Sequence, residues 1–219
     1  MATRQLLAGL LADYERRSGA AVAMESVGGV DAAKRVQAGE AFDLVVLASD
    51  AIAKLEAAGH VVAGSTTDLV HSGVAVAVRA GSTLPDLASE QSVRQAVLAA
   101  PTIGYSTGPS GVALAKLFEQ WGIAAEVQAR TVQAPPGVPV GSLVASGEVA
   151  LGFQQLSELM HLAGITVAGP LPPAIQITTT FSAGICTASQ QRGAVGRLLD
   201  FLASPETADA KRGQGMDPA

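Results

Sequence analysis

The chain has 219 residues, a length that fits one large domain or two small lobes. Hydrophobic residues make up 48% of it and charged residues only 15%, so the chain can bury a substantial core and disorder is disfavoured. The net charge is −5 and there is no basic stripe interleaved with aromatic residues, which argues against nucleic-acid binding.

The first part of the chain alternates helices and strands. Apolar positions at helical spacing predict a helix over residues 3–17 that ends at Gly19. After it we expect a strand at 20–25, a turn at 26–29, a helix at 31–38, a buried strand at 42–48 and a helix that ends at Gly59. This order predicts a parallel sheet with helices on its faces.

A long apolar run at 70–78 then predicts an extended crossing strand, and a helix is expected at 92–99. From Thr102 the alternation restarts, with strands at 102–105, 126–132, 149–153 and 165–168 and helices at 110–121, 138–146 and 155–162. A β-branched strand at 175–187 and helices at 190–203 and 205–212 close the chain. We therefore expect two α/β lobes joined by two crossings, lobe 1 formed by 1–75 and 176–219 and lobe 2 by 76–175, which can hinge around a ligand.

The most informative segment is Ile103–Gly111, a strand followed by a glycine-rich turn and a helix. Such a turn directs free backbone N–H groups and the positive end of a helix dipole at a ligand. Ser106, Thr107 and Ser110 add small polar groups to it. The pattern is not a P-loop, because the Lys-Ser/Thr pair after the second glycine is absent. The alternative is a tight turn that only starts a helix.

Three other junctions are candidates of the same kind. Gly28 and Gly29 allow a ligand to approach the backbone closely, or form a plain connector. Gln154 and Gln155 stand between a strand and a helix, where they serve either a ligand or a helix cap. The proline-dense segment that ends at Pro139 is either a stiff loop or a wall of a binding site.

Residues suited to acid–base chemistry are few. Glu25, at the end of an expected strand, is the best candidate base, although an ion pair with Lys34 or Arg35 is the simpler explanation. His71 is the second candidate, because it stands at an expected crossing strand. Cys186 lies in an expected buried strand and is interpreted as a core residue.

No metal or cofactor is expected. His60, His71 and His161 are too far apart in sequence to show a metal-binding spacing. No run of apolar residues approaches the roughly 20 that a membrane span needs. No catalytic residue is assigned, and the sequence favours a protein that binds over one that catalyses.

Three segments resemble the periplasmic molybdate-binding proteins, which are type II solute-binding proteins of ABC transporters. They are Arg35–Asp50, Pro109–Lys116 and Ser204–Lys211. The resemblance implies a two-lobed α/β fold of the periplasmic-binding-protein type II, with mixed sheets flanked by helices and a ligand cleft between the lobes. It also implies a monomer, a small oxyanion or carboxylate ligand and an ABC permease as partner.

The resemblance places binding loops at Thr3, at Gly28–Gly29, at Ser110, at Pro139 and at Gln155, and Arg4 is the basic group expected near them. The family holds its oxyanion with serine hydroxyls on the first two loops and a tyrosine on the last. Alanine or threonine, two glycines and a glutamine stand there in this chain. This exchange favours a larger ligand with carbonyl, carboxylate or hydroxyl groups, because amide side chains both donate and accept hydrogen bonds.

Two further readings follow from the N-terminus. The family begins with a strand before its first helix, and here Met1 stands at or just before that helix, without a signal-peptide pattern. The protein is periplasmic if an upstream signal was removed and cytoplasmic if Met1 is the true start. A cytoplasmic paralogue would act as an enzyme, an isomerase or proton-transfer catalyst on a small organic acid, or as a ligand sensor.

Overall fold

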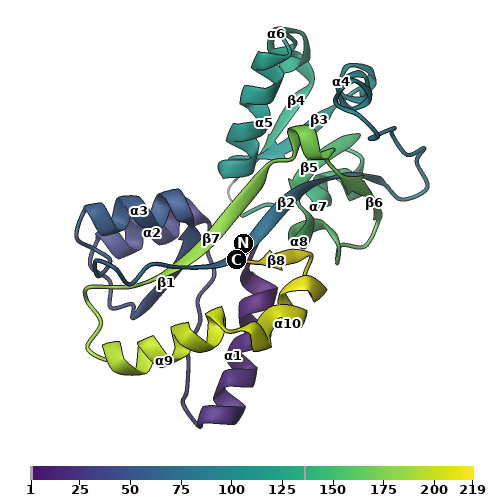
Figure 1. Cartoon of the computed structure of the whole chain (residues 1–219). Coiled ribbons are helices and arrows are strands. Elements are labelled where there is room, and N and C mark those ends of the chain that lie inside the picture. The colour runs from purple at the N-terminus through teal and green to yellow at the C-terminus, as the bar shows by residue number, and fades with distance from the viewer. Residues whose placement is uncertain (1, 136) are drawn as a thin grey trace. The chain divides into compact units, whose positions relative to one another are not determined.

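A computed structural model describes residues 2–135 and 137–219 (Figure 1). The chain divides into two compact units, one of Met1–Ser72 with Thr179–Ala219 and the other of Gly73–Thr178. We call them unit 1 and unit 2 and describe each by itself. The lobe limits predicted from the sequence, at 75 and 176, stay a prediction.

Unit 1 surrounds a small antiparallel sheet with helices. Its helices are α1 (Arg4–Ser18), α2 (Gly29–Gln37), α3 (Ser49–Ala57), α9 (Arg192–Ala203), the short η3 (Pro205–Thr207) and α10 (Ala208–Gly213). Its strands are β1 (Leu44–Ala48), most of β7 (Thr178–Ile185), the first part of β2 (Thr67–Arg79) and β8 (Met216–Pro218). β1 pairs antiparallel with β7, and β8 pairs antiparallel with β2.

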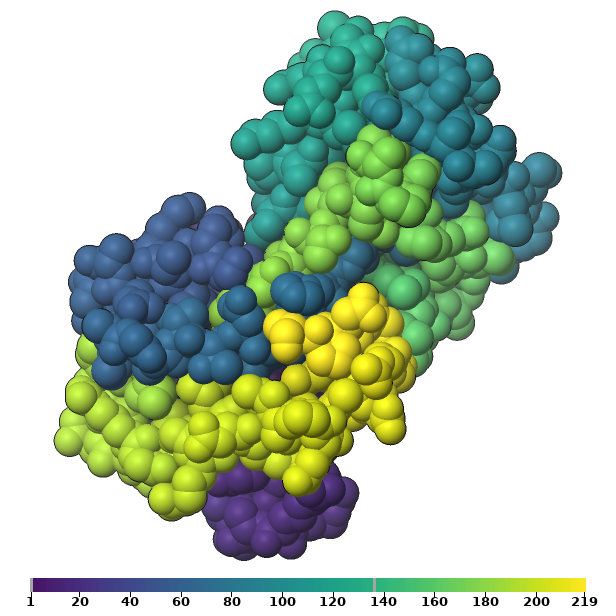
Figure 2. All heavy atoms as spheres, viewed as in Figure 1, coloured from purple at the N-terminus to yellow at the C-terminus, as the bar shows by residue number. Residues whose placement is uncertain are grey.

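Strand β1 explains why residues 42–48 form one apolar run. Val45 and Leu47 pack with α2 and α3, whereas Leu44 and Val46 pack with α1 and α9. A strand covered by helices on both faces loses the usual alternation of polar and apolar residues. Figure 2 shows the atoms of α1, in purple, against those of the C-terminal helices, in yellow, with which α1 is in contact.

Two expectations for unit 1 are wrong. Residues 19–28 form no strand, and most of them are exposed; Val22 is held instead by its N–H, which donates to Glu15 Oε1 at 2.7 Å. With so little apolar area to bury, this segment gains little from joining a sheet. β1 consequently pairs with an antiparallel neighbour and not with the parallel one that the βαβα order predicted. Strand β8 was not predicted, because it has only three residues.

Unit 2 contains parallel strands, as the sequence indicated, within a mixed sheet. Its strands are β3 (Ile103–Ser106), β4 (Thr131–Ala134), β5 (Leu151–Gln155), β6 (Ile165–Pro170) and the second part of β2. Its helices are α4 (Glu90–Ala99), α5 (Pro109–Gln120), α6 (Ala124–Val127), α7 (Val140–Ser146) and α8 (Leu156–Leu159), with the short η1 (Gln128–Arg130) and η2 (Pro173–Ile175). β3 runs parallel to β4 and β5, and β2 runs antiparallel to β5 and β6, so the sheet is mixed.

Two predicted strands of this region were placed too early. Residues 124–130 are helical, because Ile123 and Val127, four residues apart, both pack into the core and are 1% exposed. The last long strand begins at Thr178, after the prolines that start η2. Trp121 is half-buried against the core of unit 2, and its Nε1 donates to Glu90 Oε1 at 2.6 Å. No helix among the described residues is long and apolar enough to cross a bilayer.

Candidate functional site

The start of α5 in unit 2 is formed as the sequence predicted. Strand β3 ends at Ser106, Gly108 is the N-cap and Pro109 is the first helical residue. Ser106 Oγ accepts the Gly108 N–H at 3.3 Å. Proline has no N–H, so the helix-start donors that lack an intrahelical acceptor are those of Ser110 and Gly111.

Packing requires glycine at position 111, independently of any ligand. A Cβ atom there would stand 1.8 Å from the carbonyl oxygen of Ser106. α5 therefore packs against the end of β3 so closely that only glycine fits. Gly108 is different, because a Cβ there would come no closer than 3.5 Å to Ser106 Oγ.

The hydroxyl groups of this loop differ in their surroundings. Ser110 is only 6% exposed, and no hydrogen bond from its side chain to another described residue is found. Thr107 is exposed and Ser106 is half-buried. Tyr105, just before them, packs edge-on against Phe118, and burial raises the pKa of its phenol. Ser110 is thus the buried hydroxyl at the start of α5.

Gln154 and Gln155 end β5 and are each 3% exposed. Gln154 Oε1 accepts the Val140 N–H, the first of α7, at 2.8 Å. The Gln154 side chain also hydrogen-bonds Glu158, a carboxyl whose pKa is raised because burial disfavours its charged form. Gln154 thereby occupies the first N–H of α7, whereas Gln155 is the N-cap of α8.

The loop before α7 ends at Pro139, the half-buried N-cap of that helix. Residue 136, in the same loop, lies outside the described residues. Glu158 was missed by the sequence reasoning. The signal was available, since it stands in a short helix between Leu156 and Leu159, in surroundings where a carboxylate is desolvated.

Two helix starts of unit 1 correspond to the predicted loops. Thr3 is the N-cap of α1 and 8% exposed, with no side-chain cap bond, and Arg4 after it is exposed. Gly28 is the N-cap of α2, with φ −58°, and a Cβ there would be 3.6 Å from Asp31 Oδ2. A Cβ on Gly29 would also meet nothing closer than 3.7 Å. Neither glycine is therefore required by the fold itself.

The candidate acid–base residues have clear partners. Glu25 Oε2 accepts from Arg35 Nη1 at 2.7 Å, so the ion-pair explanation is confirmed. His71 Nδ1 lies 2.9 Å from Thr180 Oγ1. Cys186 is 2% exposed, and burial, with the nearby charge of Asp43, raises its thiol pKa to about 11, which confirms a core thiol. Among the described residues no group of three His, Cys, Asp or Glu side chains could hold a metal ion.

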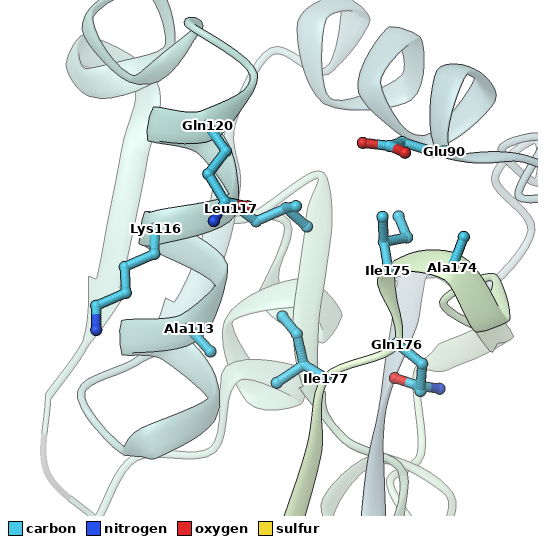
Figure 3. Close-up of a pocket in the computed structure, with 9 residues that line it drawn as sticks. All are labelled: Glu90, Ala113, Lys116, Leu117, Gln120, Ala174, Ile175, Gln176 and Ile177. Carbon is cyan, nitrogen blue, oxygen red and sulfur yellow. The ribbon is translucent and has the colours of Figure 1, made fainter.

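A surface pocket of about 440 Å³ in unit 2 lies beside α5 (Figure 3). Leu117 and Ile177 point into it. Two of its polar groups are already engaged, since Glu90 accepts from Trp121 and Gln176 Oε1 accepts the Val74 N–H at 3.1 Å. None of the predicted site residues lines this pocket. It follows the side of α5 and not its N-terminus, so the helix-start loops of each unit remain separate candidate binding positions.

Comparison with known proteins identifies the family. The family described as bacterial extracellular solute-binding protein matches residues 1–217. The chain belongs to this family. It is also 37% identical, over 185 residues, to a protein from Pseudomonas sp named aconitate isomerase; the match covers 84% of this chain and 70% of that protein.

Solved structures agree on the fold. The periplasmic molybdate-binding protein of Azotobacter vinelandii is 20% identical, with a TM-score of 0.80, over 98% of this chain and 95% of that one. The tungstate-binding protein of Desulfovibrio alaskensis is 14% identical, with a TM-score of 0.67, over 98% and 93%. The predicted type II periplasmic-binding-protein fold and the resemblance to molybdate-binding proteins are confirmed.

Proposed function

We propose that this solute-binding protein takes a small organic acid with several carboxylates as its ligand. The observation that carries the proposal is the 37% identity, over 84% of the chain, to a protein named for aconitate, an unsaturated tricarboxylic acid. The molybdate- and tungstate-binding structures are 20% identical or less. The sequence relative thus favours a carboxylic acid as ligand, while the solved structures support the fold.

A helix start in unit 1 and one in unit 2 each offer groups that suit an anionic ligand. α5 presents the first-turn N–H groups together with the buried Ser110 hydroxyl, and α2 presents its N–H groups beside Gly28 and Gly29. Backbone N–H groups at a helix start bind carboxylate oxygens well, because the helix dipole adds to the hydrogen bonds. With a net charge of −5, the chain must attract an anion through such local groups.

The same residues argue against a tetrahedral oxyanion. The fold does not require glycine at 28 or 29, yet no hydroxyl stands at either position. Because Gly28 and Gly29 have no side chains, space is free at the start of α2. A tricarboxylate is larger than molybdate and makes use of that space.

A thermal-shift and calorimetry screen tests the proposal. The probes are cis-aconitate, trans-aconitate, citrate, molybdate, tungstate and sulfate. At 100 times its dissociation constant a ligand stabilises the folded protein by about 2.7 kcal/mol. For a chain of this size that raises the melting temperature by about 5–11 °C. We expect this rise with a tricarboxylate; a rise with molybdate or tungstate alone refutes the proposal.

A second candidate function is isomerisation of such an acid, and the name of the Pseudomonas relative favours it specifically. Moving a double bond requires a proton to leave one carbon and another to be delivered nearby, which a positioned acid–base group can perform. Incubation of the purified chain with trans-aconitate, followed by NMR, tests this function directly. Appearance of the cis isomer supports it, and an unchanged spectrum at high protein concentration excludes it. In the binding role, the partner we propose is an ABC permease.

A further inference from the structure

Three neighbouring strands of unit 1 carry a hydroxyl, an imidazole and a carboxylate next to one another. His71 stands on β2, and its Nδ1 lies 2.9 Å from Oγ1 of Thr180 on β7. Asp217 on β8 is the partner of His71 in the antiparallel register. Residues directly opposite each other in such a pair project from the same face of the sheet. The three side chains therefore form a row with the imidazole in the middle.

The row lies on the accessible face of this part of the sheet. The register pairs Ser72 with Met216, and these residues are 0% and 2% exposed. Because successive side chains alternate between faces, the residues between them project the other way. His71 and Thr180 are half-buried there and Asp217 is exposed. A small molecule can reach the row, while the opposite face belongs to the core.

We propose that His71 is the proton-transfer residue of the isomerase function, with Thr180 and Asp217 as positioning residues; this rests on that second candidate function. Thr180 engages Nδ1 and so fixes the ring orientation. No described residue is found hydrogen-bonded to Nε2, which is left for a substrate. Asp217 stands directly opposite His71 in the register of β2 and β8.

The step is balanced without an oxidant or a cofactor. Nε2 takes a proton from the saturated carbon next to the double bond of an unsaturated polycarboxylic acid. The electron pair of the broken C–H bond forms the new double bond. The far carbon of the old double bond then takes the proton from Nε2, and the imidazole returns to its starting state. Glu25 is less suited to this step, because its carboxylate is paired with Arg35.

The test compares His71→Gln with His60→Gln in the full chain. His60 is a matched control, because its hydrogen bonds to described residues, to the Leu55 oxygen and from Thr187, are made by its main-chain atoms. Turnover of trans-aconitate is measured by NMR, and trans-aconitate binding by calorimetry. We expect His71→Gln to lower kcat by about 10²–10⁴-fold, the usual contribution of an acid–base group. Binding should change little, and His60→Gln should retain the parent activity.

Two further measurements separate chemistry from folding. Added imidazole should restore part of the activity of His71→Ala, which a merely structural loss would not allow. Thr180→Val should lower kcat more than it raises KM, because it frees the ring without removing a binding group. Parent-like turnover by His71→Gln overturns the assignment while leaving the isomerase function intact. Absence of turnover in the parent chain overturns both the assignment and the function.

Discussion

The substitution Gly111→Ala tests how the loop at the start of α5 is built. The added Cβ would lie 1.8 Å from the backbone oxygen of Ser106 and 2.8 Å from its carbonyl carbon. A backbone group cannot rotate away as a side chain can, so α5 must shift. Overpacking costs about 1–3 kcal/mol in most cores. For a contact this short we expect a cost at the upper end of that range, about 3 kcal/mol. Such a loss of stability lowers the melting temperature by about 6–12 °C.

The matched control is Gly108→Ala in the same loop. Its Cβ has room, at 3.5 Å from Ser106 Oγ, and its φ of −75° suits any residue. The few tenths of a kcal/mol lost at the N-cap are offset by the lower entropy of the unfolded chain. Both variants are measured by thermal and urea unfolding. Equal stability of Gly111→Ala and Gly108→Ala would refute the close packing of α5 on β3.

Three further predictions concern single residues. Gly28→Ala should leave the melting temperature unchanged, because its Cβ meets nothing closer than 3.6 Å, but should weaken tricarboxylate binding in calorimetry; unchanged affinity argues against a ligand at α2. Gln154→Leu should destabilise the protein by about 1–3 kcal/mol in urea unfolding, because it leaves the buried Val140 N–H without its acceptor. Cys186 should resist iodoacetamide at pH 8, since its pKa of about 11 keeps it a thiol. Unfolding frees that thiol to ionise, so stability should fall as pH rises from about 9 to 11.

The sequence by itself determined the elements whose side chains follow a clear period. α1, α5, α9 and the strand ending at Ala48 all form within a few residues of their predicted limits. These segments have apolar residues at helical spacing or in one continuous run, and helices cover them in the fold. The glycine-rich loop before α5 was also identified, because its turn chemistry is local.

Only the tertiary structure decided the partners of these elements. Residues 20–25 have a strand-like composition but form no strand and are mostly exposed. The pairing of β1 with β7 joins segments that lie far apart in the chain. The role of Gln154 was also decided by the tertiary structure. Its side-chain oxygen accepts the Val140 N–H at the start of α7, which lies 14 residues earlier in the chain. The row of Thr180, His71 and Asp217 lies on three strands that no local pattern connects. Register between distant strands depends on packing, and a single sequence carries little information about it.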